Sequence, residues 1–181
     1  MDGDPSVWYS FNMAKPHKTS LAACGEHYVA SYLSGMGLVV ALTRGGAPAT
    51  DIIVTSQSGG RSVSLQVKSG GPYSHTVSKR NPKNNQWTWR VGASASEKPS
   101  EYHWYAFVFI GDWPRENRPP NPEVFFVSSG FVKKTVAENP DSQRDWFWMS
   151  EETAADYSGL AGFRKLVAAL ATNEFEDTTR S

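Results

Sequence analysis

Two neighbouring stretches decide the fold: DIIVTS at residues 51–56 and SVSLQVKS at residues 62–69. Both are rich in β-branched and apolar residues, and the Ser58-Gly59-Gly60 tripeptide between them favours a turn. Together they predict two antiparallel strands, at 50–56 and 62–69, joined as a hairpin. The rest of the fold is inferred outward from this hairpin.

The hairpin brings three chemically useful side chains together. A turn centred on Ser58 and Gly59 sets Asp51 opposite Gln66, with their Cβ atoms about 5 Å apart. Because side chains alternate along a strand, Gln66 and Lys68 point to the same face. We therefore expect a carboxylate, an amide and an ammonium group on one patch of sheet.

The segments around the hairpin predict an alternation of helices and strands. Apolar residues at helical spacing predict a helix from Ser20 to about Met36, followed by a strand at 38–44. Later segments predict strands at 104–110, 124–129 and 146–149, helices at 131–138 and 154–171, and one further strand around Trp87 and Trp89. This succession predicts an α/β (α+β) fold with a central mixed sheet flanked by helices.

Chain length favours a single domain over residues 1–181. A chain of 181 residues can bury a core without metal or disulfide staples. The proline-rich loop at 114–122 leaves too few residues after it for a second stable core, so we interpret it as a loop rather than a domain linker. The one cysteine, Cys24, excludes an internal disulfide framework, and with only four histidines it argues against a structural zinc site.

Nothing in the sequence predicts a membrane association. The longest apolar run, residues 104–110, is far shorter than the roughly 18 residues that cross a bilayer. The N-terminus lacks the basic-then-apolar pattern of a targeting segment. With one unpaired cysteine, the expected location is the cytoplasm.

The formal net charge of zero hides a segregated distribution. Residues 52–96 contain six basic residues and no acidic residue, whereas residues 137–181 contain nine acidic and four basic residues. A local basic surface favours a polyanionic partner even on a neutral molecule, the alternative being a solvated loop. The acidic C-terminal region is a candidate contact for a basic protein partner.

Glu26 is a second unusual carboxylate. Its neighbours three and four positions away on the predicted helix are all apolar, so it lies beside the apolar stripe. A carboxylate in such surroundings is costly unless a cation compensates it. The structural alternative is an ion pair with Lys68 or Arg44.

The order of these residues resembles the PD-(D/E)xK nuclease superfamily. Gly25-Glu26 stands on the first helix, APATDIIV at 47–54 on a strand and LQVKS at 65–69 on the next strand. A Gln in the middle position is similar to the variants found in Mrr-like restriction enzymes, and the helix Glu is placed as in archaeal Holliday junction resolvases. The resemblance covers residues 20–70 and, in its succession of elements, extends to 129.

This resemblance implies a restriction-endonuclease-like αβββαβ core at about 20–129 with a C-terminal extension at 130–181. It implies that Asp51, Gln66, the main-chain carbonyl of Val67 and Glu26 hold one or two Mg²⁺ or Mn²⁺ ions. Lys68 would orient the attacking water or stabilise charge on the phosphate. Two departures stand out: the proline is three positions before Asp51, and Gln66 replaces an acidic residue.

The acid-free block also supplies candidate nucleic-acid contacts, because cations bind phosphates and aromatic rings can stack on bases. For the tryptophans the alternative is packing under a surface strand. The candidates are Lys79, Arg80, Lys83, Arg90, Tyr73, His75, Trp87 and Trp89.

We therefore expect a metal-dependent endonuclease that hydrolyses phosphodiester bonds, in DNA rather than RNA, with a role in restriction or in DNA repair. Two cuts in a duplex commonly need two sites, so a homodimer is a candidate assembly. The alternative is a catalytically silent member of the fold that binds nucleic acid, or an immunity or accessory protein. Gln66 is the residue that keeps this alternative open.

Overall fold

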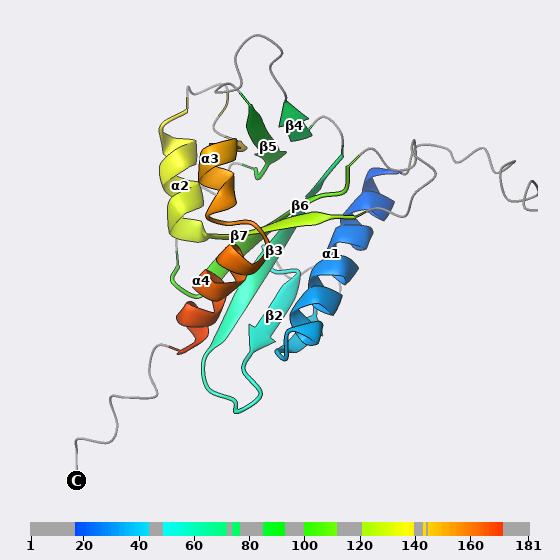
Figure 1. Ribbon diagram of the computed structural model, residues 1–181, viewed down its shortest axis with the longest axis vertical. Coiled ribbons are helices and arrows are strands. Elements are labelled where there is room, and N and C mark those ends of the chain that lie inside the picture. Colours follow the sequence, from blue (N-terminus) through cyan, green and yellow to red (C-terminus); the bar gives the residue numbers. More distant parts are fainter. Residues whose placement is uncertain are drawn as a thin grey trace, which may run out of the picture.

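The protein has three layers, with a five-stranded sheet in the middle (Figure 1). The structure is a computed structural model of the chain and describes residues 17–43, 49–71, 74–76, 85–92, 100–111, 121–139, 143 and 145–171. Its helices are α1 (Lys18–Gly35), α2 (Ser129–Ala137), α3 (Glu151–Ala155) and α4 (Gly159–Ala171). Its strands are β1 (Val39–Leu42), β2 (Ile52–Thr55), β3 (Ser62–Gly70), β4 (His75–Thr76), β5 (Gln86–Arg90), β6 (His103–Phe109), β7 (Glu123–Ser128) and β8 (Trp146–Ser150).

The larger sheet has the strand order β1-β2-β3-β6-β7. β3 and β6 are parallel and the other neighbours are antiparallel, so the sheet is mixed, as predicted. β2 and β3 form the predicted hairpin, with Ile52 opposite Leu65 and Thr55 opposite Ser62. This confirms the hairpin and its register over the four pairs of β2.

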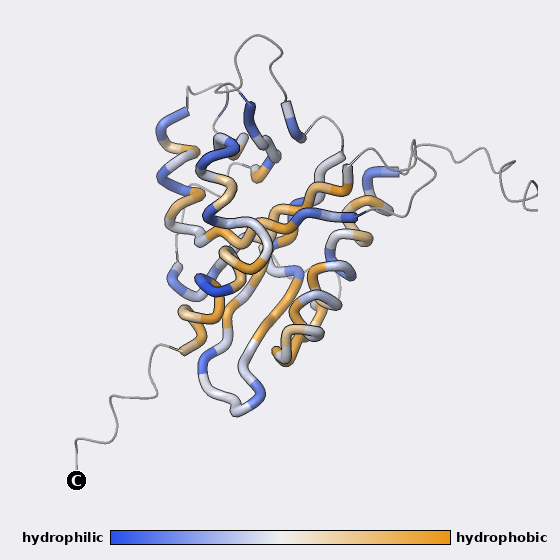
Figure 2. Tube along the Cα trace, viewed as in Figure 1, coloured by the Kyte–Doolittle hydropathy of each residue, from blue (hydrophilic) through white to orange (hydrophobic). Residues whose placement is uncertain are grey.

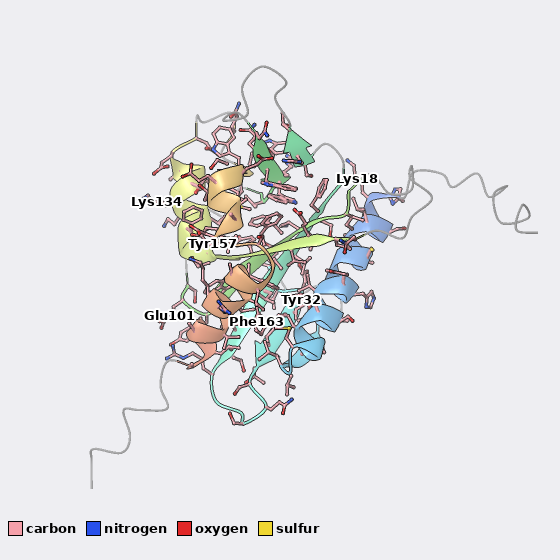
Figure 3. All side chains as sticks on the ribbon, in the orientation of Figure 1. Lys18, Tyr32, Glu101, Lys134, Tyr157 and Phe163 are labelled. Atoms are coloured by element: carbon pink, nitrogen blue, oxygen red, sulfur yellow. The ribbon has the colours of Figure 1, made fainter. Side chains whose placement is uncertain are left out.

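Each face of the larger sheet buries its own apolar cluster. On one face, Val67 of β3 and Ala106 of β6 pack with Val29 of α1 and Leu166 of α4. The two helices meet there, where the rings of Tyr32 and Phe163 lie 6.3 Å apart (Figure 3). Figure 2 shows the matching pattern, with hydrophobic residues on β2 and hydrophilic ones at the turn that follows it.

The opposite face is covered by the smaller sheet, β4-β5-β8, and by α2. Its cluster is largely aromatic: Trp89 packs on Phe107 with ring centroids 4.9 Å apart, and Phe107 stacks on Phe147 at 4.6 Å. The alternation of β6 residues between two apolar surroundings explains why this strand reads as a continuous hydrophobic run.

The connection from β3 to β6 differs from the expected core. An αβββαβ core has a helix between its third and fourth strands, but the described residues of this connection form β4 and β5 and no α-helix. The sequence there is polar and carries Trp87 and Trp89 at alternate positions, which is the period of a strand rather than of a helix. The mixed α/β sheet flanked by helices is therefore observed, and the αβββαβ order is not seen in the described residues.

The helix expected at 154–171 is also different, because it is divided into α3 and α4. Between them the carbonyl of Tyr157 accepts a hydrogen bond from the backbone N–H of Phe126 at 3.0 Å, so the chain runs briefly along the edge strand β7. A Cβ at Gly162 would collide with that carbonyl oxygen, so glycine lets α4 pack this closely. Within the described residues, no helix has the length and apolar character needed to cross a membrane.

Candidate functional site

Asp51 lies where the regular pairing of β2 with β3 ends. Its backbone N–H donates to the carbonyl of Leu65 at 2.8 Å, and its own carbonyl accepts from the N–H of Thr43 at 2.9 Å. In a regular strand both groups of one residue point to the same neighbour, so the backbone turns at Asp51. The predicted pairing with Gln66 is thus shifted by one residue at this point.

The turn at Asp51 aims its carboxylate at the edge of β3. Oδ2 accepts a hydrogen bond from the backbone N–H of Val67 at 2.7 Å. Because backbone N–H groups lie in the plane of a sheet, this carboxylate lies beside the strand edge rather than on either face. The carbonyl of Val67 points to the same side as its N–H, so it faces the same region.

Glu26 approaches this region from α1. Gly25 makes the approach possible, because a Cβ there would overlap the Ser69 hydroxyl of β3. Burial raises the pKa of the Glu26 carboxyl and the negative charge of Asp51 raises it further, while His27 lowers it. The two carboxylates thus lie within electrostatic reach of each other, and the charge of Asp51 disfavours the ionised form of Glu26.

Lys68 follows Val67 on β3 and is half-buried. Burial lowers the pKa of its ammonium group, and the negative charge of Asp51 opposes this effect. Neither Glu26 nor Asp51 makes an ion pair with Lys68 among the described residues. The structural alternative for Glu26 is therefore not formed with Lys68, and Arg44 lies outside the described residues.

His103 is a site residue that the sequence did not reveal. It begins β6 opposite Ser64 of β3, and its Nδ1 lies 2.9 Å from the Ser64 hydroxyl. Burial lowers the pKa of His103, while the negative charge of Asp51 raises it. Ser64 and His103 come together through the parallel pairing of β3 with β6. A contact between residues so far apart in the sequence leaves no local pattern, so sequence reasoning had no signal for it.

The predicted nucleic-acid residues have different outcomes. Arg90 is exposed and donates from Nε to Asp145 at 2.6 Å. His75 lies 2.9 Å from Glu151 through Nε2 and stacks on Trp87 with ring centroids 3.9 Å apart. Four others lie outside the described residues: Tyr73, Lys79, Arg80 and Lys83.

Trp87 and Trp89 belong to the aromatic core rather than to the surface. Their exposed fractions are 8% and 2%, and Trp89 donates from its indole N–H to the carbonyl of Val108 at 3.4 Å. Rings packed in this way are not free to stack on bases. Both side chains therefore pack under the surface, which is the alternative considered for them, and neither belongs to the proposed nucleic-acid surface.

The oxygen atoms gathered here suit a hard divalent cation. Asp51 and Glu26 offer carboxylates and Val67 a backbone carbonyl. Gln66 lies on the same face of β3 as Lys68, as predicted from the alternation along the strand. Mg²⁺ is typically held by one or two carboxylates while it keeps several waters. In the described part of the chain, no three His, Cys, Asp or Glu side chains cluster as a metal site. A cation would therefore rest on two carboxylates and neutral oxygens.

The comparisons add no relative: no protein-family model, no curated protein and no solved structure matches the chain.

Proposed function

We propose that this protein is a metal-dependent endonuclease that hydrolyses phosphodiester bonds, with DNA as the favoured substrate and with a role in restriction, repair or recombination. The observation that carries the proposal is the hydrogen bond from Val67 N–H to Asp51. It fixes a carboxylate beside a backbone carbonyl and next to Lys68, with Glu26 within electrostatic reach.

Asp51, Glu26, Gln66 and the carbonyl of Val67 would hold Mg²⁺ or Mn²⁺. Bound there, the cation would neutralise charge on the scissile phosphate and lower the pKa of a ligated water. Lys68 would place an ammonium group where negative charge grows on the phosphate oxygens. His103 would remain neutral at ordinary pH because burial lowers its pKa, leaving a ring nitrogen able to accept a proton.

A second candidate is a catalytically silent member of the fold that binds nucleic acid or a protein. Gln66 favours it, because an amide offsets less cation charge than the carboxylate usual at that position. The acidic C-terminal region is the candidate surface for a basic protein partner in that case. A homodimer is compatible with either candidate, since two cuts in a duplex commonly need two sites.

The test is a panel of plasmid, linear, branched and single-stranded substrates incubated with Mg²⁺ or with a chelator. Wild type is compared with Asp51→Ala and Lys68→Ala, and with Lys165→Ala as the matched control, since Lys165 lies on α4 over the ring of Tyr157. We expect cleavage by wild type and by the control only when metal is present. Full activity of both site variants would refute the nuclease assignment.

Binding of Mn²⁺ separates the two candidates. Titration that depends on Asp51, together with cleavage, supports the enzyme. Nucleic-acid binding without Asp51-dependent metal binding or cleavage supports the silent module.

A further inference from the structure

A pocket of about 480 Å³ opens directly beside the candidate site. Its walls come from the first turns of α1, the end of β3, and strands β5 and β8 of the smaller sheet. It shares Val67 and Lys68 with the candidate site, so the two are continuous. Figure 3 shows Lys18 at the start of α1. Pockets that hold small molecules begin at roughly 300 Å³, so this one has room for a nucleotide.

One wall of the pocket is a strand edge with hydrogen-bonding capacity. β2 pairs with β3 only as far as Leu65, and no other strand of the described residues pairs with that edge beyond it. Val67 and Ser69 direct their backbone groups to this side, because the direction alternates along the strand. The N–H of Val67 is bonded to Asp51 and its carbonyl faces the proposed cation site, so the backbone groups of Ser69 are the ones offered to a ligand. Ser74 and Thr88 add hydroxyl groups. Such donors and acceptors suit the edge of a nucleobase.

The other walls carry cations and an aromatic ring. Lys18, Lys68 and Arg90 line the pocket, and no acidic residue of the described chain does. Asp145 offsets the charge of Arg90, whereas Lys18 and Lys68 make no ion pair within the described residues. Trp146 also lines the pocket and is 39% exposed, unlike the two tryptophans of β5.

We propose that this pocket holds one unpaired nucleotide of the substrate strand, next to the scissile phosphate. Trp146 stacks on its base, the backbone of Ser69 and the hydroxyls of Ser74 and Thr88 bond to the base edge, and Lys18 contacts a phosphate. A base inside a duplex is already stacked and paired, so the protein favours single-stranded or branched nucleic acid over a continuous duplex. The position of the cut rests on the proposed nuclease function, but binding in the pocket does not.

The experiment measures binding by fluorescence anisotropy in an Asp51→Asn background, which prevents cleavage. The probes are one labelled DNA strand alone, in a blunt duplex and in a duplex with a short overhang, and the same three forms in RNA. Single-stranded and overhang probes should bind about tenfold more tightly than the blunt duplex, since base stacking on an aromatic ring is a large contribution. Comparison of the DNA and RNA probes shows whether the protein also distinguishes deoxyribose from ribose.

Trp146→Ala should reduce the ratio of overhang to blunt-duplex affinity to about one. Trp146→Phe should keep most of this ratio, because an aromatic ring is retained. Leu160→Ala is the matched control, an exposed apolar residue on α4, and should change nothing. Lys18→Ala is a second variant at an exposed position and should weaken binding of the overhang probe several-fold. Equal affinity for all probes, or a preference that survives Trp146→Ala, overturns the pocket assignment.

Different experimental results would refute the proposed nucleotide pocket and the proposed nuclease activity. A Trp146-dependent preference without Mg²⁺-dependent cleavage by wild type removes the enzyme and keeps the pocket. Cleavage of blunt duplex and single strand at equal rates, unaffected by Trp146→Ala, keeps the enzyme and removes the pocket.

Discussion

Asp51 and Val67 are joined by a hydrogen bond of 2.7 Å from a backbone N–H to a carboxylate oxygen. It holds the carboxylate in the plane of the larger sheet, at the point where β2 stops pairing with β3. The bond serves both the local fold and the proposed cation site, and these two roles can be separated by substitution.

The substitution Asp51→Asn should separate the structural role of this carboxylate from its proposed role as a cation ligand. An amide oxygen still accepts from Val67, so we expect a loss of at most about 1 kcal/mol in the free energy of unfolding, measured by urea denaturation. Removal of the charge should abolish Mn²⁺ binding and cleavage. Metal binding equal to that of wild type would show that Asp51 is not a ligand.

Gln66→Glu should strengthen cation binding. A third carboxylate adds negative charge to the site, so Mg²⁺ affinity should rise on the order of tenfold, measured by isothermal titration calorimetry. In a silent protein this single change should create measurable metal binding. The matched control is Gln57→Glu in the turn after β2, which should leave affinity unchanged because it lies outside the site. An unchanged affinity for Gln66→Glu would place Gln66 outside the cation site.

Glu26→Gln should change the pH dependence of stability. The folded-state pKa of Glu26 is raised above its usual 4.5, by burial first and by Asp51 second. The folded state therefore binds the proton more tightly, and stability is lost as pH rises from the unfolded pKa through the raised folded one. At about pH 7 the variant should have the higher Tm, and the difference should shrink toward about pH 4.

The effect of Mg²⁺ on the Tm of wild type and of Glu26→Gln provides a second test of the surroundings of Glu26. Mg²⁺ at neutral pH should raise the Tm of wild type more than that of Glu26→Gln, because the cation favours the ionised carboxyl. A Tm difference independent of both pH and Mg²⁺ would contradict the assigned surroundings of Glu26.

Gly162→Ala should loosen α4 from the larger sheet. The added methyl group would meet the backbone carbonyl of Tyr157, which accepts from Phe126, and backbone cannot rotate away. We expect a loss of roughly 1–3 kcal/mol in the free energy of unfolding. Gly130→Ala on α2 is the control: nothing lies within 4 Å of its Cβ position, so stability should be unchanged or slightly raised. Equal stabilities for the two variants would be inconsistent with the packing of α4 on β7.

The sequence by itself determined the elements with a local cause. A turn of Ser58-Gly59-Gly60 between two β-branched arms fixes the β2–β3 hairpin and its register, and apolar spacing fixes α1. Hydrophobic runs likewise locate β6 and β7. In each case the signal lies within one element or one turn, because periodicity and turn chemistry act over a few residues.

Only the tertiary structure decided how these elements meet. It turned the backbone at Asp51 toward Val67, divided the last helix where Tyr157 bonds to β7, and placed His103 beside Ser64 through a parallel pairing. It also buried Trp87 and Trp89 while leaving Trp146 at a pocket wall. These outcomes depend on contacts between segments that are distant in the sequence. Such contacts stabilise the fold without producing a periodicity or a motif that could be recognised in the sequence.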